Sequence, residues 1–382
     1  MKHTCLVNAK EDEKGIAGQA RNDSSFRMKT MRAQVLMEPN RMEMHEVSIP
    51  EINENEVLIK VKYCGICGSD WGSYTGKYAD EAALLPLTTG HEFWGEIVET
   101  GEKVKKFKPG DRVAVDICLT CGTCYYCRHG DGLLCESFTQ IGIHTPGAFA
   151  EYVKAPWQNC YILPDSIDDY SAAFIEPLTA CLHASKAMDL KIGSSIVVIG
   201  CGLGVIHGAL AKLRGAAPVI VVGDNAERLA KAKEMCADYV INIQETPDAV
   251  AEVLKLTNGI GADYVLEAVG SSQTYEQAFK MLRKGGKLEA FGICADDDYA
   301  QIPPVQFVLQ EKKVSGSCAG IGNDWGDAIT LLQYNRIDPR PLISMIVPLE
   351  EVEIALKELR TNPALVKVLV APEIKERIIL YK

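Results

Sequence analysis

Cys121-Gly-Thr-Cys124-Tyr-Tyr-Cys127, followed by Cys135, is the stretch of this chain that says most about its fold. Four cysteines with this spacing can enclose one zinc ion in a tetrahedral shell of thiolates. The glycines among them allow the sharp turns that bring the sulfur atoms together. Because four sulfur ligands leave no open coordination position, we expect a structural zinc here and the chemistry elsewhere in the chain.

The composition narrows the class of protein. The chain carries a formal net charge of −11, whereas zinc ribbons that bind nucleic acid normally present a basic face. No apolar run approaches the roughly 18 residues that span a bilayer, and the N-terminus lacks the apolar run of a secretory signal. Closely spaced cysteines in a large chain of this kind indicate a cytoplasmic metal-binding protein rather than a disulfide-linked one.

The chain has 382 residues, a length that suggests two domains or three. Two different patterns of apolar and polar residues follow one another along it. Alternating segments such as 56–62 and 95–99, punctuated by glycine and proline, predict an antiparallel or barrel-like β domain in the first part. From about Ala172, apolar strands such as 195–199 alternate with helical segments such as 227–236. This alternation predicts βαβ units and a doubly wound parallel sheet.

The two ends of the chain differ from its middle. Residues 1–29 are polar, charged and without periodicity, so we expect a disordered leader or an extension upstream of the natural start, and assign it no function. The tail is predicted to hold helices at about 325–333 and 349–359 and a last strand at 367–370, and to return to the first domain.

A glycine-rich turn, Ile199-Gly200-Cys201-Gly202-Leu203-Gly204, follows an apolar strand and opens a helix. Such a turn lets backbone N–H groups approach a pyrophosphate, although the third glycine of the usual G-x-G-x-x-G comes one position early. Asp224 follows the next strand, where an acid can bind a ribose 2′-hydroxyl and repel a 2′-phosphate, which favours NAD over NADP. The alternative is that Asp224 only begins a turn and caps the next helix.

A second group of candidate metal ligands is spread along the chain. Cys67, the pair His91-Glu92 and Glu176 offer thiolate, imidazole and carboxylate, which together suit zinc. Three protein ligands leave a position for water or substrate, which is the catalytic arrangement. Each piece alone is weak evidence, because an isolated cysteine is usually a small buried residue and a lone His-Glu pair is more often surface or core.

Together these motifs resemble the zinc-dependent medium-chain dehydrogenase/reductase superfamily, in its sorbitol and threonine dehydrogenase branch. The resemblance covers about residues 31–382. It rests on five features in the family's order: Cys67-Gly-Ser-Asp70, Gly90-His91-Glu92, the four-cysteine lobe, Ile175-Glu176-Pro177-Leu178 and the glycine turn. It implies a GroES-like β-barrel catalytic domain, a Rossmann coenzyme domain and an active site in the cleft between them. The implied boundaries are 30–180 for the catalytic domain with its zinc lobe at 118–136, 181–322 for the Rossmann domain, and 323–382 for the return to the catalytic domain.

The resemblance also implies roles for single residues. The implied ligands of the catalytic zinc are Cys67, His91, Glu92 and Glu176, with the two glutamates able to exchange, directly or through water. Asp70 falls on the acid that orients the zinc histidine, and Ser69 on the hydroxyl that receives the substrate's proton. Cys64 lies outside the pattern and is expected to be a core residue. The implied coenzyme surface consists of Gly200, Gly202, Leu203, Gly204, Asp224, Arg228, Val269 and Gly270.

Two positions depart from the family pattern. Five residues after the zinc cysteine the family often has a histidine that ends a proton relay, and this chain has Gly72. The proton then leaves through water or the ribose, or another residue serves. The glycine turn is one residue short, and counting back from Ala211-Lys212 places the family's ribose acid at Gly223 rather than Asp224. NAD stays preferred, with NADP possible.

The resemblance implies an enzyme that oxidises a secondary alcohol of a polyol, cyclitol or sugar alcohol to a ketone, with hydride transfer to NAD(P) and two zinc ions per chain. L-threonine or a simple secondary alcohol is the alternative substrate. The resemblance also implies a homotetramer or homodimer, without nucleic-acid or membrane partners. Two other classes stay open: a catalytically silent nucleotide-binding sensor, suggested by Gly72 and the irregular turn, and a zinc-ribbon nucleic-acid binder.

Overall fold

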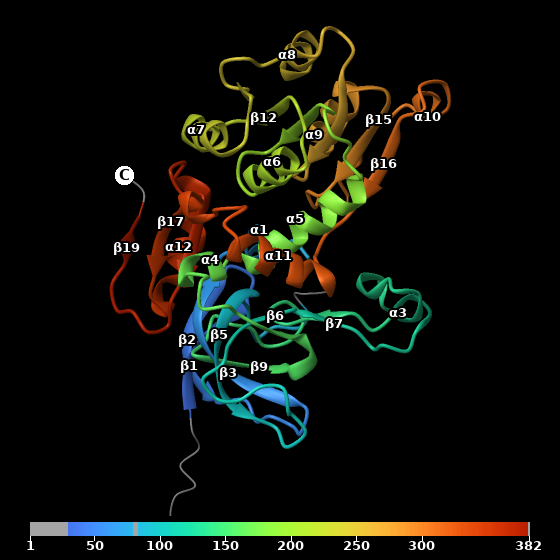
Figure 1. Ribbon diagram of the computed structural model, residues 1–382. Coiled ribbons are helices and arrows are strands. Elements are labelled where there is room, and N and C mark those ends of the chain that lie inside the picture. Colours follow the sequence, from blue (N-terminus) through green and yellow to red (C-terminus); the bar gives the residue numbers. More distant parts are fainter. Residues whose placement is uncertain (1–29, 79–82, 296, 381–382) are drawn as a thin grey trace, which may run out of the picture.

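The computed structural model of the chain describes residues 30–78, 83–295 and 297–380. The expected leader at residues 1–29 lies outside the described residues. Figure 1 shows a β-rich half below and a sheet flanked by helices above, with helix α5 (Ile175–Met188) running between them. In the part of the chain that is described, no helix has both the length and the apolar character needed to cross a bilayer.

Antiparallel strands build the β-rich half, as the alternating segments predict. β3 (Glu56–Gly65) pairs with β5 (Glu92–Thr100) along its length, and with β9 (Tyr152–Pro156) near its start. Val57 and Ile59 of β3 are fully buried in the core of this half. Further strands here are β1 (Thr30–Glu38), β2 (Arg41–Ser48), β4 (Leu87–Thr88), β6 (Arg112–Val115) and β10 (Cys160–Ile162).

The tail of the chain rejoins this half. β18 (Lys367–Val370) pairs with the end of β3, and β17 (Ile343–Val347) runs parallel to β18, with α12 (Val352–Thr361) between them in sequence. A further strand, β19 (Ile378–Ile379), pairs with β17, so β18 is not the last strand and that expectation was wrong. Two residues are too few to show the alternating pattern by which a strand is recognised.

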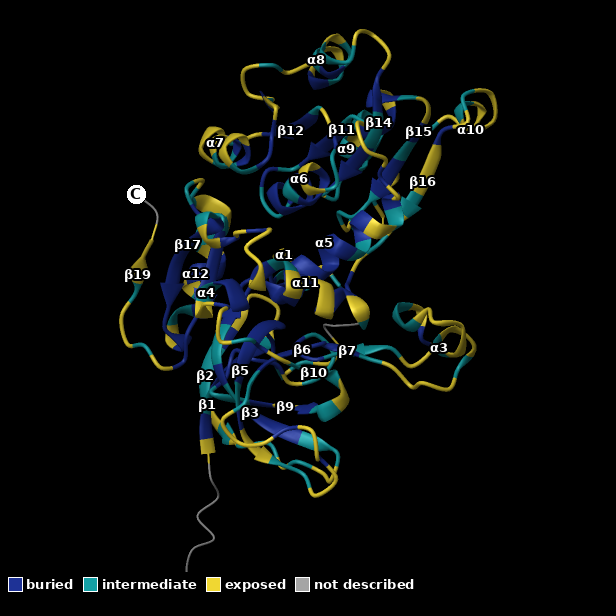
Figure 2. Cartoon of the chain, viewed as in Figure 1, coloured by how far each residue is buried: buried dark blue, intermediate teal, exposed yellow. Residues whose placement is uncertain are grey.

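A parallel sheet of order β13-β12-β11-β14-β15-β16 forms the other half. Its strands are β11 (Ile196–Ile199), β12 (Val219–Gly223), β13 (Tyr239–Asn242), β14 (Ala262–Glu267), β15 (Leu282–Ala290) and β16 (Lys313–Gly316). β11 and β12 are buried at every residue, and Figure 2 shows them in dark blue. This is the doubly wound Rossmann arrangement, which confirms the predicted fold class.

Helices cover the faces of the sheet and link the two halves. Those of the parallel half are α6 (Gly204–Leu213), α7 (Ala226–Met235), α8 (Ala249–Leu256) and α9 (Ser272–Met281), and the shorter helices of the chain include α1 (Gly68–Thr75), α4 (Asp169–Ala172) and α10 (Val305–Leu309). α11 (Asn323–Gln333) packs on α5, and the two helices share a core with β11 and β17. One apolar core therefore joins the halves along α5.

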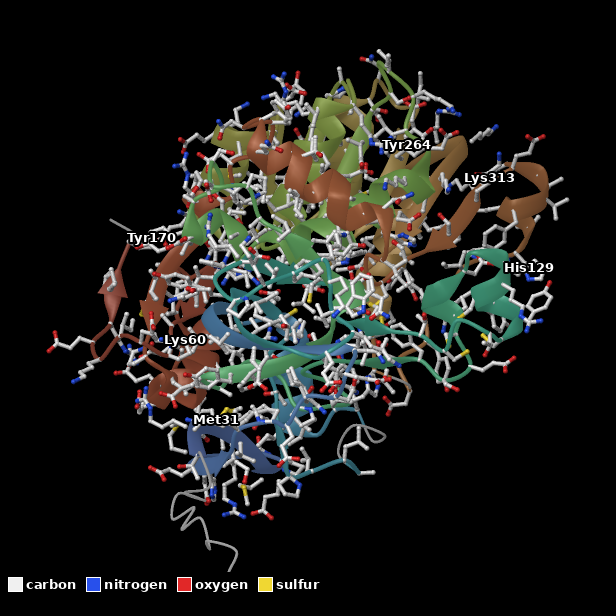
Figure 3. All side chains as sticks on the ribbon, turned by 60° about the horizontal axis from the view of Figure 1, so that its bottom comes forward. Met31, Lys60, His129, Tyr170, Tyr264 and Lys313 are labelled. Atoms are coloured by element: carbon white, nitrogen blue, oxygen red, sulfur yellow. The ribbon has the colours of Figure 1, made fainter. Side chains whose placement is uncertain are left out.

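The cysteine segment forms a lobe that stands away from both halves in Figure 1. β7 (Cys118–Leu119) and β8 (Thr139–Gln140) pair at its base, and α3 (Tyr125–His129) and the 3-10 turn η1 (Gly132–Leu134) form its outer part. Figure 3 shows His129 on the outer side of the lobe. Neither α3 nor η1 contains a fully buried residue, although Leu133 of η1 packs, partly buried, against the core of the β-rich half. A bound metal ion would add to the cohesion of this part.

Candidate active site and metal centres

Cys67 lies where β3 ends and α1 begins, as the residue that precedes the first turn of the helix. Its backbone N–H donates to Oδ2 of Asp70 at 2.8 Å, which closes that turn. The other carboxylate oxygen of Asp70, Oδ1, lies 3.5 Å from Nδ1 of His91. One buried carboxylate thus links the Cys67 turn to the imidazole.

The pairing of β3 with β5 brings His91 and Glu92 to the same place. Gly65 of β3 stands opposite Glu92, so the chain just beyond it reaches the side of His91 at Cys67. Glycine is required at residue 65, because a Cβ there would lie 2.1 Å from Oε2 of Glu92. Gly90 precedes the pair with a φ of 94°, a left-handed conformation that favours glycine.

Cys67, His91 and Glu92 each offer a ligand atom, and these three atoms all lie within 4.8 Å of one another. Nδ1 of His91 is buried and faces the Asp70 carboxylate at 3.5 Å, a contact longer than an ordinary hydrogen bond. The hydroxyl oxygen of Ser69 lies 3.3 Å from the other ring nitrogen, Nε2. A thiol, an imidazole and a carboxylate gathered in this way fit a zinc ion with a coordination position left open.

A lysine that was not predicted from the sequence completes the cluster. Nζ of Lys367, at the start of β18, lies 2.6 Å and 2.8 Å from the two oxygens of the buried Glu92 carboxylate. Burial disfavours the charged ammonium, yet the charges of Glu92 and Cys67 outweigh burial and raise the pKa of Lys367. The signal in the sequence was a lysine inside the apolar run 365–370, where a charge is costly without a partner.

Glu176 lies in the first turn of α5, near the cluster but not within the group of ligand atoms that the described residues bring together. Burial raises the pKa of Glu176 to about 7, while the charge of His91 opposes this shift and that of Glu92 reinforces it. A carboxyl group with this pKa exchanges protons near neutral pH.

Gly72, where the family often has a histidine, lies against the ring of Tyr78. A Cβ on Gly72 would lie 2.2 Å from Cε2 of Tyr78 and 2.9 Å from its hydroxyl oxygen. The ring therefore occupies the space that a side chain at residue 72 would need.

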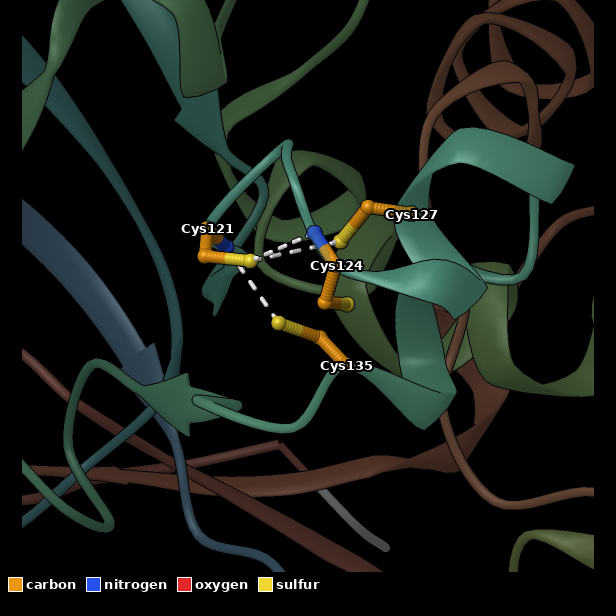
Figure 4. Close-up of side chains that lie close together, drawn as sticks. All are labelled: Cys121, Cys124, Cys127 and Cys135. Atoms are coloured by element: carbon orange, nitrogen blue, oxygen red, sulfur yellow. Dashed lines mark hydrogen bonds between the residues drawn. The ribbon is translucent and has the colours of Figure 1, made fainter.

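Figure 4 shows the four cysteines of the lobe, whose sulfur atoms all lie within 4.8 Å of one another. Sγ of Cys121 accepts hydrogen bonds from the backbone N–H groups of Thr123 and Cys124, at 3.4 Å and 3.3 Å. These bonds, with the Thr123 hydroxyl, lower the pKa of Cys121 to about 6. The thiolate, which is the metal-binding form, is thereby favoured, and the set fits a closed tetrahedral zinc site.

The glycine turn leads from β11 into α6. Gly200 has a φ of 117°, and the helix begins at Gly204, so the first N–H groups of the helix follow the end of the strand within a few residues. Leu203 immediately precedes the helix, and Gly202 has open space where a Cβ would stand. This is the local geometry that a pyrophosphate group requires.

Asp224 follows β12 directly, and the residue that caps α7 is the next one, Asn225, which accepts a hydrogen bond from the N–H of Arg228 at 2.9 Å. The alternative that Asp224 is the helix cap was therefore wrong. Residue 223 must be glycine, because a Cβ there would lie 2.5 Å from Sγ of Cys201 in the glycine turn. This contact explains why the acid stands one position later than the family pattern.

Val269 and Gly270 lie in the loop after β14, and a buried carboxylate organises that loop. Glu267 accepts hydrogen bonds from the N–H of Val269 at 2.8 Å, the N–H of Gly270 at 3.1 Å and the hydroxyl of Thr274 at 2.8 Å. Glu267 was not predicted from the sequence, where its signal was an acid at the end of an apolar strand. Its position at the carboxyl end of a parallel strand is where such sheets bind ligands.

A barrel joined to a Rossmann sheet, with a thiolate, an imidazole and a carboxylate gathered beside the joining helix, defines the class of metal-dependent dehydrogenases. Comparison with known families agrees: residues 53–165 match the alcohol dehydrogenase GroES-like domain, and residues 202–334 match the zinc-binding dehydrogenase domain.

Individual relatives point the same way. The chain is 37% identical over 331 residues to a sorbitol dehydrogenase of Halalkalibacterium halodurans, covering 85% of this chain and 93% of the relative. It is 36% identical over 267 residues to an L-threonine 3-dehydrogenase of Chelativorans sp. strain BNC1, covering 69% and 77%. A zinc-binding dehydrogenase of Sinorhizobium meliloti 1021 bound to NADP has a similar structure, with a TM-score of 0.82, 32% identity and coverage of 90% of this chain and 100% of that one.

The chain belongs to the zinc-dependent medium-chain dehydrogenase/reductase superfamily, in the branch of sorbitol and threonine dehydrogenases. It is accordingly a zinc- and NAD(P)-dependent oxidoreductase that acts on CH–OH donors.

Proposed function

We propose that this enzyme oxidises a secondary alcohol of a polyol, cyclitol or sugar alcohol to a ketone and that NAD accepts the hydride. The observation that carries the proposal is the gathering of Cys67, His91 and Glu92 within 4.8 Å, with Glu176 close by on the helix between the two halves. The similarity to a sorbitol dehydrogenase supports a polyol. L-threonine is the second candidate substrate, because an L-threonine 3-dehydrogenase is almost as similar.

Each residue of the cluster has a distinct task in this proposal. A zinc ion held by Cys67, His91 and Glu92 would act as a Lewis acid toward the substrate oxygen. Ser69, whose hydroxyl lies beside His91, takes the proton that the alcohol releases and passes its own hydroxyl proton on to water or to the coenzyme ribose. Asp70 holds the imidazole in place.

Lys367 and Glu176 tune the charge of the site. The ammonium of Lys367 balances the carboxylate of Glu92, so the thiolate of Cys67 is left as the uncompensated anion of the three donors. This balance preserves the electron-withdrawing strength of a bound divalent cation. Glu176, whose pKa is about 7, would hold a water molecule near the cluster, or would take the place of Glu92 as the third ligand of a bound zinc ion.

The coenzyme lies across the carboxyl ends of the parallel strands in this proposal. Asp224 binds the ribose hydroxyls and would repel a 2′-phosphate, which favours NAD. The remaining coenzyme contacts come from Gly200, Gly202, Leu203, Gly204, Arg228, Val269 and Gly270.

We also assign the enzyme to the cytoplasm as a homodimer or homotetramer with two zinc ions per chain, one of them in the four-cysteine lobe. Support for self-association comes from β16, which ends the parallel sheet, and from α10 just before it. Val308 and Leu309 are each 76% exposed, and Val314 on β16 is also exposed. A second copy placed edge to edge at β16 would cover these apolar side chains and the unpaired strand edge.

The decisive experiment measures zinc content and turnover of the purified enzyme. Polyols, cyclitols, L-threonine and 2-butanol are offered with NAD and with NADP. We expect about two zinc ions per chain and the highest kcat/KM for a polyol or cyclitol with NAD. Highest turnover of L-threonine would replace the proposed substrate. About one zinc ion and no turnover would instead indicate a silent nucleotide-binding sensor.

A further inference from the structure

A cavity of about 560 Å³ lies between the cysteine lobe, α5 and the loops that follow β15 and β16. Figures 1 and 3 show the lobe, with His129, on the same side of the molecule as β16, with Lys313. Much of the cavity wall is apolar, including Leu133 of the lobe and Ile293 after β15. Among its few polar linings is His183, on α5.

One end of the cavity lies near the part of α5 that carries Glu176. Its wall includes Cys318 and Ala319, and a Cβ on the next residue, Gly320, would lie 2.5 Å from Thr179, three residues after Glu176. The lobe forms the other end. His183 lies seven residues after Glu176 on α5, which places it on the same face of the helix and about 10 Å further along. A substrate whose reacting carbon is at the cluster can therefore reach His183 only with its far end.

His183 is fixed in orientation by a buried acid. Its Nδ1 lies 3.0 Å from Oδ2 of Asp324, and Nζ of Lys186 lies 2.6 Å from Oδ1 of the same carboxylate. Although burial acts in the opposite direction, hydrogen bonds from His183 and Lys186 lower the pKa of Asp324, so this group is an ionised acceptor.

The contact with Asp324 determines which hydrogen-bonding role each ring nitrogen of His183 can take. An ionised carboxylate only accepts hydrogen bonds, so Nδ1 of His183 carries the proton that it donates to Asp324. In the neutral ring the other nitrogen, Nε2, is then an acceptor, and its natural partner is a hydroxyl donor. A phosphate is a poorer partner, because Asp131 also lines the cavity and Asp324 lies directly behind the imidazole.

We infer that His183 is a specificity-determining residue of the proposed alcohol oxidation: its Nε2 accepts a hydrogen bond from a second substrate hydroxyl, remote from the carbon that is oxidised. This inference rests on the proposed function and names the residue that would distinguish its polyol, cyclitol and sugar-alcohol substrates from monoalcohols. A monoalcohol leaves the acceptor unpaired in a largely apolar cavity, and sites built to bind a hydroxyl discriminate against ligands that lack it.

Two isosteric variants test the inference. His183→Asn keeps a donor to Asp324 but has no atom at the position of Nε2, whereas His183→Gln can place its amide oxygen there. We expect His183→Asn to raise KM for the preferred polyol about tenfold with little change in kcat, and to leave the kinetics of 2-butanol unchanged. His183→Gln should recover most of the loss. His45→Asn serves as the control, because His45 also pairs with a carboxylate, Glu43, but lies on β2.

A second measurement does not depend on turnover. Calorimetric titration of the polyol into the enzyme saturated with reduced coenzyme should show an affinity about tenfold lower in His183→Asn, while thermal melting verifies that the variant is folded. An unchanged ratio of kcat/KM for polyol and monoalcohol in His183→Asn would overturn the inference and leave the alcohol oxidation standing. If the wild type oxidises no alcohol, the proposed function fails, and the titration alone then decides for or against His183. A preference for a polyol phosphate that disappears in His183→Asn would also overturn the assignment to a hydroxyl.

Discussion

Cys67 and Cys64 lie three residues apart at the end of β3, but they differ in burial and in the residues that surround them. Cys64 is fully buried in the core of the β-rich half, whereas Cys67 is half-buried beside His91 and Glu92. In sequence the two form a C-x2-C pair that resembles a metal site, and only strand pairing shows which sulfur reaches the other ligands.

Cys67→Ala should abolish alcohol oxidation, because it removes the thiolate of the three-residue cluster, while coenzyme affinity and the unfolding transition stay close to those of the wild type. Steady-state kinetics, coenzyme titration and a urea melt measure the three quantities. Cys64→Ala is the matched control and should retain activity with a stability loss on the order of 1 kcal/mol. Wild-type turnover by Cys67→Ala would contradict the assignment of the catalytic metal.

Lys367→Met should destabilise the fold by about 3–5 kcal/mol, because it leaves the carboxylate of Glu92 buried without a partner. Urea unfolding measures the effect. Lys367→Arg, which keeps the charge, should lose much less, and adding Glu92→Gln to Lys367→Met should recover stability by removing the uncompensated charge. A Lys367→Met variant as stable as the wild type would show that the ion pair does not form.

Motifs in the sequence identified the candidate metal ligands that lie close together in the structure. They did not identify the charged residues that stabilise the surroundings of those ligands and of the coenzyme loop. Cys67, His91 and Glu92 were predicted as candidates because thiolate, imidazole and carboxylate share one chemistry. Lys367 and Glu267 were not, because a single charged residue in an apolar run has no spacing rule, and its partner is known only once strands are paired. The ligand roles of the predicted residues stay predictions.

At the scale of elements, the four-cysteine lobe is the part that we expect to depend on a bound metal. Its helix α3 and turn η1 bury no residue fully, and four sulfur atoms lie at its centre. Coordination would therefore add to the limited apolar packing that Leu133 provides.

Cys124→Ser should lower the zinc content from about two ions per chain to about one and reduce the melting temperature, while freshly prepared enzyme keeps most of its kcat. Metal analysis, a thermal scan and kinetics at low temperature provide the three readouts. A loss of activity in a variant whose melting curve is unchanged would contradict a structural role for the lobe.

Periodicity placed some elements closely but gave no bounds for others of similar length, such as β1 and β15. The predicted segments at 56–62 and 195–199 coincide with β3 and β11 to within a few residues. β19 was missed because its two residues carry no pattern. The alternative that Asp224 caps α7 was wrong because Asp224 and Asn225 are both good capping residues, and only backbone geometry shows that the second one accepts the bond.

At the scale of the whole molecule, the cavity beside the cluster is made by segments that are distant in sequence. Leu133, His183, Ile293 and Cys318 belong to the lobe, the joining helix and two loops of the parallel sheet. The alternating strand segments in the first part of the sequence, and the strand–helix alternation after them, correctly predicted a barrel-like β domain and a doubly wound parallel sheet. No periodicity could predict which loops face each other across the join, because that depends on how α5 and α11 pack.

The joint variant Val308→Glu/Leu309→Glu should convert the proposed oligomer to a smaller species, because two charges would be buried where apolar side chains meet at the edge of β16. Sedimentation velocity measures the change. Ile192→Glu, at a residue that is 89% exposed on a turn before β11, is the control and should leave the mass unchanged. An unchanged mass in the joint variant would exclude this edge as the interface.

The contact between Cys201 and residue 223 also limits where an acid can stand in this coenzyme site. A side chain at 223 cannot be introduced while Cys201 is present, because its Cβ would meet Sγ at 2.5 Å and Cβ at 2.8 Å. An acid fits at position 223 only when position 201 is glycine, so as long as Cys201 is present an acid beside the coenzyme has to stand at 224.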